Sequence, residues 1–276
     1  MYVGASAAGS ATQEDCYTRH LLSNRVIGMG RLLAYVLMMF GVAAGASAAQ
    51  VSVAVATNFT APMREIAAAF AQASGHQAIL VFGATGALYA QINNGAPFQL
   101  LLAADRATPA RLEREGRGLK GSRFTYAIGQ LVLWSAQPGL VDAHGEILRT
   151  GRFERLALAN PKLAPYGAAA IETLTRMGQL ERLKSRLVQA ENITQAYQFV
   201  ATGNADLGWV ALSQVMADGQ IKAGSAWVVP GNLHAPIRQD GVVLIGGKDQ
   251  PAVAALVEFI GGDRARRIIR GYGYER

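Results

Sequence analysis

The chain contains very little cysteine, with one residue, Cys16, among 276. Cys16 lies in a leader segment, upstream of the part that we expect to fold. The folded part is therefore expected to have no disulfide bond, no reactive thiol and no cysteine that could carry a lipid anchor.

Charged residues are also scarce, at 16% of the chain, and the net charge is only +7. The Lys and Arg residues are scattered. Their densest group, between Arg264 and Arg270, has the spacings of three and four that are typical of a solvated helix face. A mild basic excess of this kind does not indicate a nucleic-acid partner, and we expect none.

The chain lacks the short motifs of common enzyme classes. His76, His144 and His234 are isolated, and no G-x-S-x-G turn is present. The turn 83–86 resembles the glycine-rich turn of nucleotide-dependent oxidoreductases, but its third glycine would fall at Tyr89, and no Y-x-x-x-K pair occurs. We expect neither catalytic activity nor a cofactor, and a nucleotide-dependent oxidoreductase is the alternative from another class.

Residues 1–49 have the layout of an upstream extension followed by a secretory signal peptide. Arg31 precedes an apolar stretch over 32–44, and Ala46-Ser47-Ala48 provides the small residues of a cleavage site. The apolar stretch is short for a membrane span. We predict cleavage near Ala48 or Ala49 and export to the periplasm, with residues 1–28 as the extension.

The most informative stretch is the turn that joins a predicted strand, 51–56, to a predicted helix that ends at Gly75. Thr57 and Asn58 lie at this turn, and Pro62 suits the first turn of the helix. Met63, Ile66, Ala67 and Phe70 then repeat with the spacing of one buried helix face. Free N–H groups and the helix dipole make such a turn attractive to anions. The alternative is that Asn58 is an ordinary helix cap.

The alternation of strand and helix continues along the chain and predicts an α/β fold with parallel sheets. The long run 124–135 is interrupted by Gly129 and exceeds an ordinary strand. This run and the segment 228–238 are expected to cross between two lobes. We assign 50–130 and 230–276 to lobe 1 and 131–229 to lobe 2, with a ligand cleft at the carboxyl ends of the strands.

Hydroxyl and amide side chains recur at the turns that join a predicted strand to the following helix. They are found at Thr57 and Asn58, at Thr85, at Tyr166, and at the turn Asn192-Ile193. Each could be an ordinary cap. Gathered around one point, they would form a ring of neutral donors able to hold an ionised oxyanion without a cation.

Six segments together resemble the periplasmic molybdate-binding proteins of ABC transporters. They are ATNF (56–59), FGATGALYAQINNGAPF (82–98), LLAAD (101–105), GSRFTYAIGQLVLWSAQPGL (121–140), NPKLAPYG (160–167) and DLGWVALSQ (206–214). The resemblance extends from Val51 to Tyr274. It implies a type II periplasmic-binding-protein fold that closes on molybdate or tungstate, with sulfate or another oxyanion as the alternative ligand.

The resemblance also implies a ligand set. The matching positions are Thr57, Asn58, Thr85, Tyr166 and the backbone N–H of Ile193. Many members of the family have serine at the positions of Asn58 and Thr85, and others place their tyrosine where this chain has Ala211. Molybdenum would enter only as the bound oxyanion. The implied partners are the permease subunits of an ABC transporter, and the protein itself is expected to be a monomer.

Overall fold

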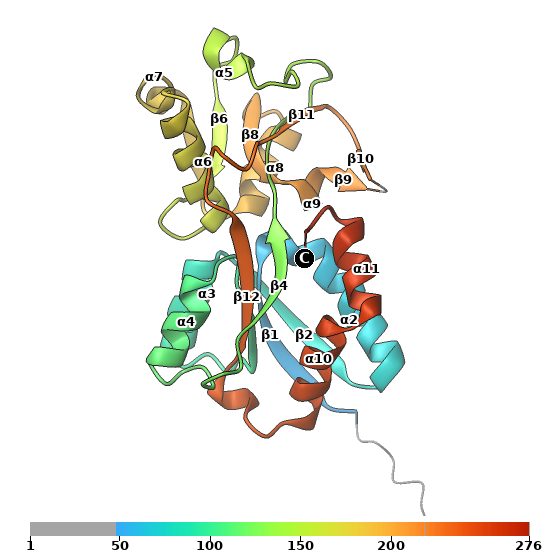
Figure 1. Cartoon of the computed structure of the whole chain (residues 1–276). Coiled ribbons are helices and arrows are strands. Elements are labelled where there is room, and N and C mark those ends of the chain that lie inside the picture. The colour runs from blue at the N-terminus through green and yellow to red at the C-terminus, as the bar shows by residue number, and fades with distance from the viewer. Residues whose placement is uncertain (1–47, 218, 276) are drawn as a thin grey trace, which may run out of the picture. The chain divides into compact units, whose positions relative to one another are not determined.

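The computed structural model describes residues 48–217 and 219–275, and the part from Ala48 onward forms one compact unit (Figure 1). The predicted extension and signal peptide therefore lie outside the described residues, apart from Ala48 and Ala49. In the described part, no helix combines the length and apolar character needed to cross a membrane.

Two five-stranded sheets define two lobes. The first has the order β2-β1-β3-β12-β4, with β12 antiparallel to both of its neighbours. Its strands are β1 (Gln50–Ala56), β2 (Gln77–Gly83), β3 (Leu100–Leu102), β4 (Phe124–Gly129) and β12 (Ile237–Val243). The helical elements of this lobe are η1 (Thr57–Phe59), α2 (Thr60–Ser74), α3 (Thr85–Asn93), α4 (Ala107–Arg114), η3 (Ile245–Gly247), α10 (Pro251–Gly261) and α11 (Asp263–Gly271).

The second sheet has the order β11-β5-β8-β6-β7. Its strands are β5 (Leu131–Ser135), β6 (Leu156–Ala159), β7 (Leu187–Ala190), β8 (Leu207–Ala211) and β11 (Ser225–Val228). The helical elements of this lobe are α5 (Ile147–Thr150), α6 (Pro165–Arg176), α7 (Leu180–Leu183), η2 (Lys184–Arg186), α8 (Ile193–Ala201) and α9 (Leu212–Val215). A short hairpin, β9 (Met216–Ala217) and β10 (Gln220–Ile221), follows α9.

Apolar residues on both faces of each sheet explain this layering. β1 is buried along almost its whole length, as expected for a central parallel strand. Its alternate side chains pack with α2, α10 and α11 on one face and with α3 on the other. In the second lobe, α6 and α8 contribute to two further core clusters. The predicted α/β fold with two lobes is confirmed, but the sheets are mixed and not parallel, because β12 in the first sheet and β5 in the second are antiparallel to both of their neighbours.

Two segments connect the lobes, and they lie side by side in Figure 1. The predicted run 124–135 divides at Gln130, so that β4 belongs to the first sheet and β5 to the second. The chain returns from β11 to β12 through residues 229–236. Strand β12 ends at Val243, and a 3-10 turn at Ile245–Gly247 follows it closely.

Candidate functional site

All five predicted ligand residues line one small cavity between the lobes. Its lining consists of Ala56, Thr57, Asn58, Gly83, Ala84, Thr85, Ala104, Ala164, Pro165, Tyr166 and Ile193. The volume open to the centre of a water-sized sphere is about 10 Å³. That is about the space of one water molecule. None of the lining residues carries a charge.

The sheet topology brings the lobe 1 residues together. β1 and β2 are parallel neighbours, with Ala56 opposite Gly83, so both strands end at the same edge. Thr57 follows β1 directly, and Thr85 begins α3 after β2. The residue before α3, Ala84, provides no side-chain cap. The first N–H groups of a helix have no carbonyl partner within the helix, so these turns present donors at the sheet edge.

Lobe 2 repeats the arrangement. β6 and β7 are parallel neighbours, with Ala159 opposite Ala190. Tyr166 is the second residue of α6, whose N-cap, Ala164, makes no side-chain hydrogen bond. Ile193 is the first residue of α8. Asn192 is an ordinary N-cap, since its Oδ1 accepts the Gln195 N–H at 3.0 Å.

Thr85 is buried and already oriented. Its Oγ1 accepts the Ala104 N–H at 3.0 Å, which uses an acceptor position and leaves the hydroxyl proton free to be donated. Thr57 is linked to the other lobe through its backbone, because its carbonyl oxygen accepts a hydrogen bond from the Thr194 hydroxyl at 3.4 Å.

Asn58 is not a helix cap. Its Nδ2 donates to Gln239 Oε1 at 2.8 Å and to Tyr274 Oη at 3.0 Å. Its carbonyl oxygen accepts from the Ser213 hydroxyl at 2.8 Å and from the Tyr274 hydroxyl at 2.6 Å. Both amide hydrogens therefore have protein partners in this arrangement. The donor that remains for an anion at this position is the backbone N–H, in the first turn of η1.

Tyr166 lies with its hydroxyl against the same cluster. Its Oη accepts from Gln239 Nε2 at 3.2 Å, and Gly129 leaves no room for a Cβ beside these two groups. Burial, followed by the proximity of Tyr274 and Tyr126, raises the pKa of Tyr166 well above its usual value. Burial also raises the pKa of Tyr274 to about 12. Both phenols are therefore neutral and keep their protons near neutral pH.

Sequence reasoning missed the supporting residues of this cluster, namely Tyr126, Ser213, Gln239 and Tyr274. All four are at least 95% buried. One local signal was available. Gln239 and Asp240 place two adjacent polar residues inside the buried strand β12, and buried polar groups usually have specific partners.

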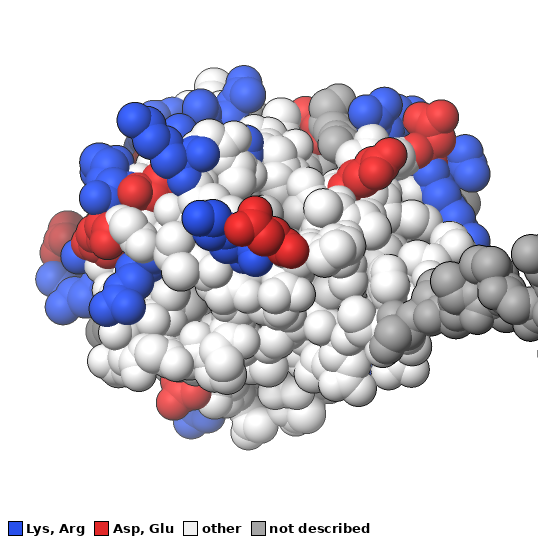
Figure 2. All heavy atoms as spheres, turned by 90° about the horizontal axis from the view of Figure 1, so that it is seen from below, with Lys and Arg blue, Asp and Glu red and all other residues white. Residues whose placement is uncertain are grey.

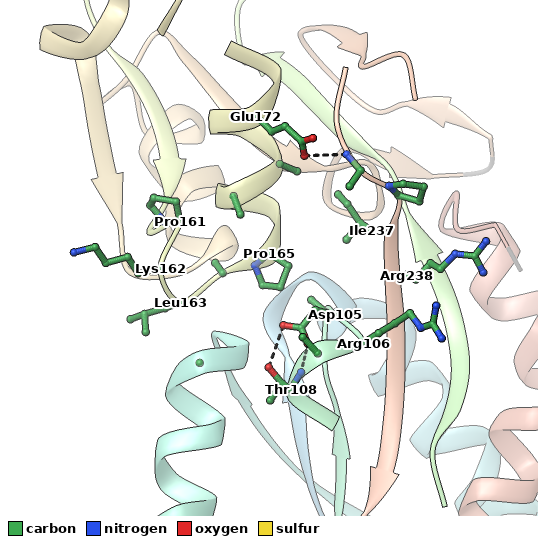
Figure 3. Close-up of a pocket in the computed structure, with 18 residues that line it drawn as sticks. Asp105, Arg106, Thr108, Pro161, Lys162, Leu163, Pro165, Glu172, Ile237 and Arg238 are labelled. Carbon is green, nitrogen blue, oxygen red and sulfur yellow. Dashed lines mark hydrogen bonds between the residues drawn. The ribbon is translucent and has the colours of Figure 1, made fainter. Parts of the chain in front are cut away.

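A second cavity between the lobes is much larger, at about 580 Å³. Figure 3 shows its lining, which includes Asp105, Thr108, Lys162 and Glu172. Both Asp105 oxygens accept from Thr108, from its N–H at 2.7 Å and its hydroxyl at 3.1 Å. Glu172 accepts from the Ala235 N–H at 2.9 Å. Its acidic groups thus already have partners.

Charges on the outer surface are mixed. On the face in Figure 2, most basic side chains gather toward the upper edges beside acidic ones, a basic and an acidic group lie together near the centre, and most of the lower part is uncharged. Within the described residues, no group of three His, Cys, Asp or Glu side chains is placed to hold a metal ion.

Residues 51–275 match the family described as bacterial extracellular solute-binding protein. The molybdate-binding protein ModA of Azotobacter vinelandii is 54% identical over 253 residues, covering 92% of this chain and 97% of the relative. ModA of Rhodobacter capsulatus is 47% identical, covering 86% and 92%. The solved structure of the Azotobacter vinelandii periplasmic molybdate-binding protein superposes with a TM-score of 0.78 at 41% identity, covering 82% of this chain and 99% of that one.

Proposed function

Because the chain belongs to the bacterial extracellular solute-binding protein family, we propose that it captures one tetrahedral oxyanion, molybdate or tungstate, between its lobes. The observation that carries this proposal is the small uncharged cavity where turns from both lobes meet. Two relatives named as molybdate-binding proteins, 54% and 47% identical, support the choice of anion.

The proposed ligands are the hydroxyls of Thr57, Thr85 and Tyr166 and the backbone N–H groups of Asn58 and Ile193. Molybdate is a dianion near neutral pH and accepts hydrogen bonds without donating any. Neutral donors fixed in a buried site interact strongly with such an ion, because hydrogen bonds to a charged group are stronger than neutral ones. Helix N-termini behind the donors favour the negative charge.

The same donors would discriminate against phosphate, which carries at least one proton near neutral pH. No carboxylate lines the cavity, so that proton would lack a good acceptor. An unsatisfied buried polar group costs about 1–3 kcal/mol. Sulfate has no proton, so only the size of the cavity can act against it, because its shorter bonds leave the oxygen contacts stretched.

Capture would involve closure of the lobes. Hydrogen bonds already join them, from the Gly86 N–H to the Leu163 carbonyl at 2.9 Å and from the Ser213 hydroxyl to the Asn58 carbonyl at 2.8 Å. An anion that contacts both lobes would add interactions that exist only in the closed state, and would therefore favour it.

In this role the protein acts in the periplasm without catalysis or a cofactor, and delivers the anion to the permease of an ABC transporter. The oxidoreductase alternative would need room for a nucleotide at the turn Gly83–Gly86. Gly83 and Thr85 line only the smaller cavity, of about 10 Å³, whereas Gly86 borders the larger one.

The test is a calorimetric titration of the processed protein with molybdate, tungstate, sulfate and phosphate at one salt concentration. We expect tight binding of molybdate and tungstate, with one anion per chain, weaker binding of sulfate and none of phosphate. Failure of all four anions to bind, or preferred binding of phosphate, would overturn the proposal.

A further inference from the structure

One side-chain amide, that of Gln239, connects the proposed ligand residues of the two lobes. Gln239 lies on β12 and is fully buried. Its Oε1 accepts from Asn58 Nδ2 at 2.8 Å and lies 3.0 Å from the Tyr126 hydroxyl, both in lobe 1. The single Tyr126 proton is shared between this oxygen and the Ala103 carbonyl, at 2.9 Å. Its Nε2 donates to the Tyr166 hydroxyl at 3.2 Å, in lobe 2.

The partners determine the direction of each hydrogen bond. The Tyr274 hydroxyl donates to the Asn58 carbonyl at 2.6 Å, so its oxygen must accept from the Asn58 side chain. This arrangement turns Asn58 Nδ2, a donor, toward Gln239, which must present its oxygen there. The opposite side of the Gln239 amide is then a donor, and Tyr166 accepts from it.

The orientation of the Gln239 amide determines which group the Tyr166 hydroxyl can donate its proton to. A phenol has one proton to donate, and its oxygen can also accept. Since Gln239 supplies a proton to Tyr166 Oη, the Tyr166 proton does not point at Gln239. The hydroxyl of Tyr274 is the other hydrogen-bond partner of Tyr166 and accepts that proton. Gly129 accommodates the contact between Gln239 and Tyr166, because a Cβ there would overlap both groups.

We propose that Gln239 is a positioning residue for oxyanion binding. It holds the Asn58 turn and the Tyr166 hydroxyl together across the two lobes and turns the Tyr166 proton away from Gln239, so that the anion competes for that proton with Tyr274 and not with Gln239. The inference rests on the proposed function, and adds to it a residue that does not line the cavity.

The test is a double-mutant cycle for molybdate affinity, using Gln239→Leu, Tyr166→Phe and the pair. We expect Gln239→Leu to weaken binding about tenfold or more, which corresponds to the loss of one hydrogen bond to a charged group. In the Gln239→Leu background, Tyr166→Phe should add less than about threefold, because coupled residues are not additive. A purely structural role would leave the two effects independent.

Thr125→Val is the matched control. It removes the hydrogen bond from the Thr125 hydroxyl to Asp240 Oδ1, at 2.7 Å, in the same pair of strands but away from the cavity. Its molybdate affinity should stay within about twofold of wild type.

Gln239→Glu is a second variant in case the leucine variant does not fold. A carboxylate at 239 would accept the Tyr166 proton, whereas a protonated carboxyl could donate as the amide does. Burial raises the pKa of a carboxyl group, by up to about 3–5 units when it is fully buried. Molybdate affinity of this variant should therefore fall as pH rises through that raised pKa, while the affinity of wild type stays flat. The titratable groups around position 239 are Tyr126, Tyr166 and Tyr274, with Asp105 and Asp240 acting on Tyr126.

The outcomes separate the two proposals. Wild-type protein that binds no oxyanion overturns the proposed function, and this inference with it. Wild type that binds molybdate, together with a Gln239→Leu variant within twofold of it or a fully additive cycle, overturns the inference alone. A Gln239→Glu pH profile parallel to that of wild type also overturns it.

Discussion

The two cavities between the lobes differ in size and in chemistry. The smaller one, of about 10 Å³, is lined by uncharged residues at strand-to-helix turns. The larger one, of about 580 Å³, contains both acidic and basic residues. For a compact anion, the arrangement of unused donors matters more than the volume of the cavity, and the smaller cavity has that arrangement.

The difference follows from where hydrogen-bonding capacity is already used. In the larger cavity, Asp105 is bonded to Thr108, and Glu172 is bonded to the Ala235 N–H (Figure 3). Burial raises the pKa of Asp105 above its usual value. A dianion beside the ionised carboxyl group would also be repelled by the like charge. In the smaller cavity, Thr85 accepts one hydrogen bond and keeps its own proton.

The largest effect should come from deleting a hydroxyl in the smaller cavity. Thr85→Val keeps the shape of the side chain and removes the donor, and Tyr166→Phe does the same in lobe 2. Each should weaken molybdate binding about 10- to 150-fold, as expected for a hydrogen bond to a charged ligand worth roughly 1.5–3 kcal/mol. Calorimetric titration measures the change.

Thr108→Val is the matched control for Thr85→Val, because Thr108 lines the larger cavity. Its affinity should stay within about twofold of wild type. If both threonine variants lost affinity equally, or if Thr85→Val bound like wild type, the assignment of the site to the smaller cavity would be wrong.

An intermediate loss of molybdate affinity is expected from substitution of Gly86, which contacts Leu163 of the other lobe. A Cβ at this position would lie 3.0 Å from the Leu163 side chain and 3.1 Å from its Cα. Gly86→Ala should therefore hinder closure and weaken molybdate binding about fivefold, at the lower end of overpacking costs near 1 kcal/mol. X-ray scattering with saturating molybdate should show a larger radius than wild type.

Gly261→Ala is the control for Gly86→Ala, since a Cβ at Gly261 meets no atom within 4 Å. Equal affinities for wild type and both alanine variants would show that the contact between Gly86 and Leu163 does not limit closure.

A smaller effect, on the free energy of unfolding, is expected in alkaline solution. The folded-state pKa of Tyr274 is raised to about 12, and those of Tyr126 and Tyr166 are also raised, all chiefly by burial. A raised pKa means that the stability from the protonated phenol is fully present below pH 10 and is lost as pH rises toward 12. The free energy of unfolding should fall over that range, and Tyr274→Phe should flatten the fall.

Urea titrations at several pH values measure this dependence. Between pH 7 and 9 neither stability nor molybdate affinity should respond to the phenols. A steep loss of affinity below pH 9 would contradict the view that the phenols of Tyr126, Tyr166 and Tyr274 are neutral in and around the site.

The smallest effect is expected from removing a cation. Lys162 lies at the edge of the larger cavity and extends away from it (Figure 3). Lys162→Gln should change molybdate affinity by less than about twofold at physiological salt, because exposed charges are screened. A larger loss would mean that charge attraction, and not neutral donors, holds the anion.

Local sequence patterns were sufficient to predict the first strand and the helix that follows it. Val53 and Val55 indicated a buried strand, Met63, Ile66 and Phe70 an amphipathic helix, and Gly75 the end of that helix, which the structure confirms. These signals are local, since they depend on spacing within one element. The resemblance then selected five residues that the structure places around one cavity.

Local patterns could mark Gln239 as an unusual buried polar residue, but they could not identify its partners in the supporting cluster. Asn58 contacts Gln239 and Tyr274 across 181 and 216 residues of sequence. Spacing within a strand or helix says nothing about such partners, so the role of the Asn58 amide could not be predicted. The Asn58 side chain, expected to donate to the anion, has both amide hydrogens bonded within the protein.

The most direct test of the account is to locate bound molybdenum by anomalous scattering from crystals grown with molybdate. We predict one molybdenum position in the smaller cavity, with its oxygens within hydrogen-bonding distance of Thr57, Thr85, Tyr166 and the Ile193 N–H. A molybdenum position in the larger cavity, beside Asp105 and Glu172, would contradict the central claim that neutral donors at the strand-to-helix turns form the site.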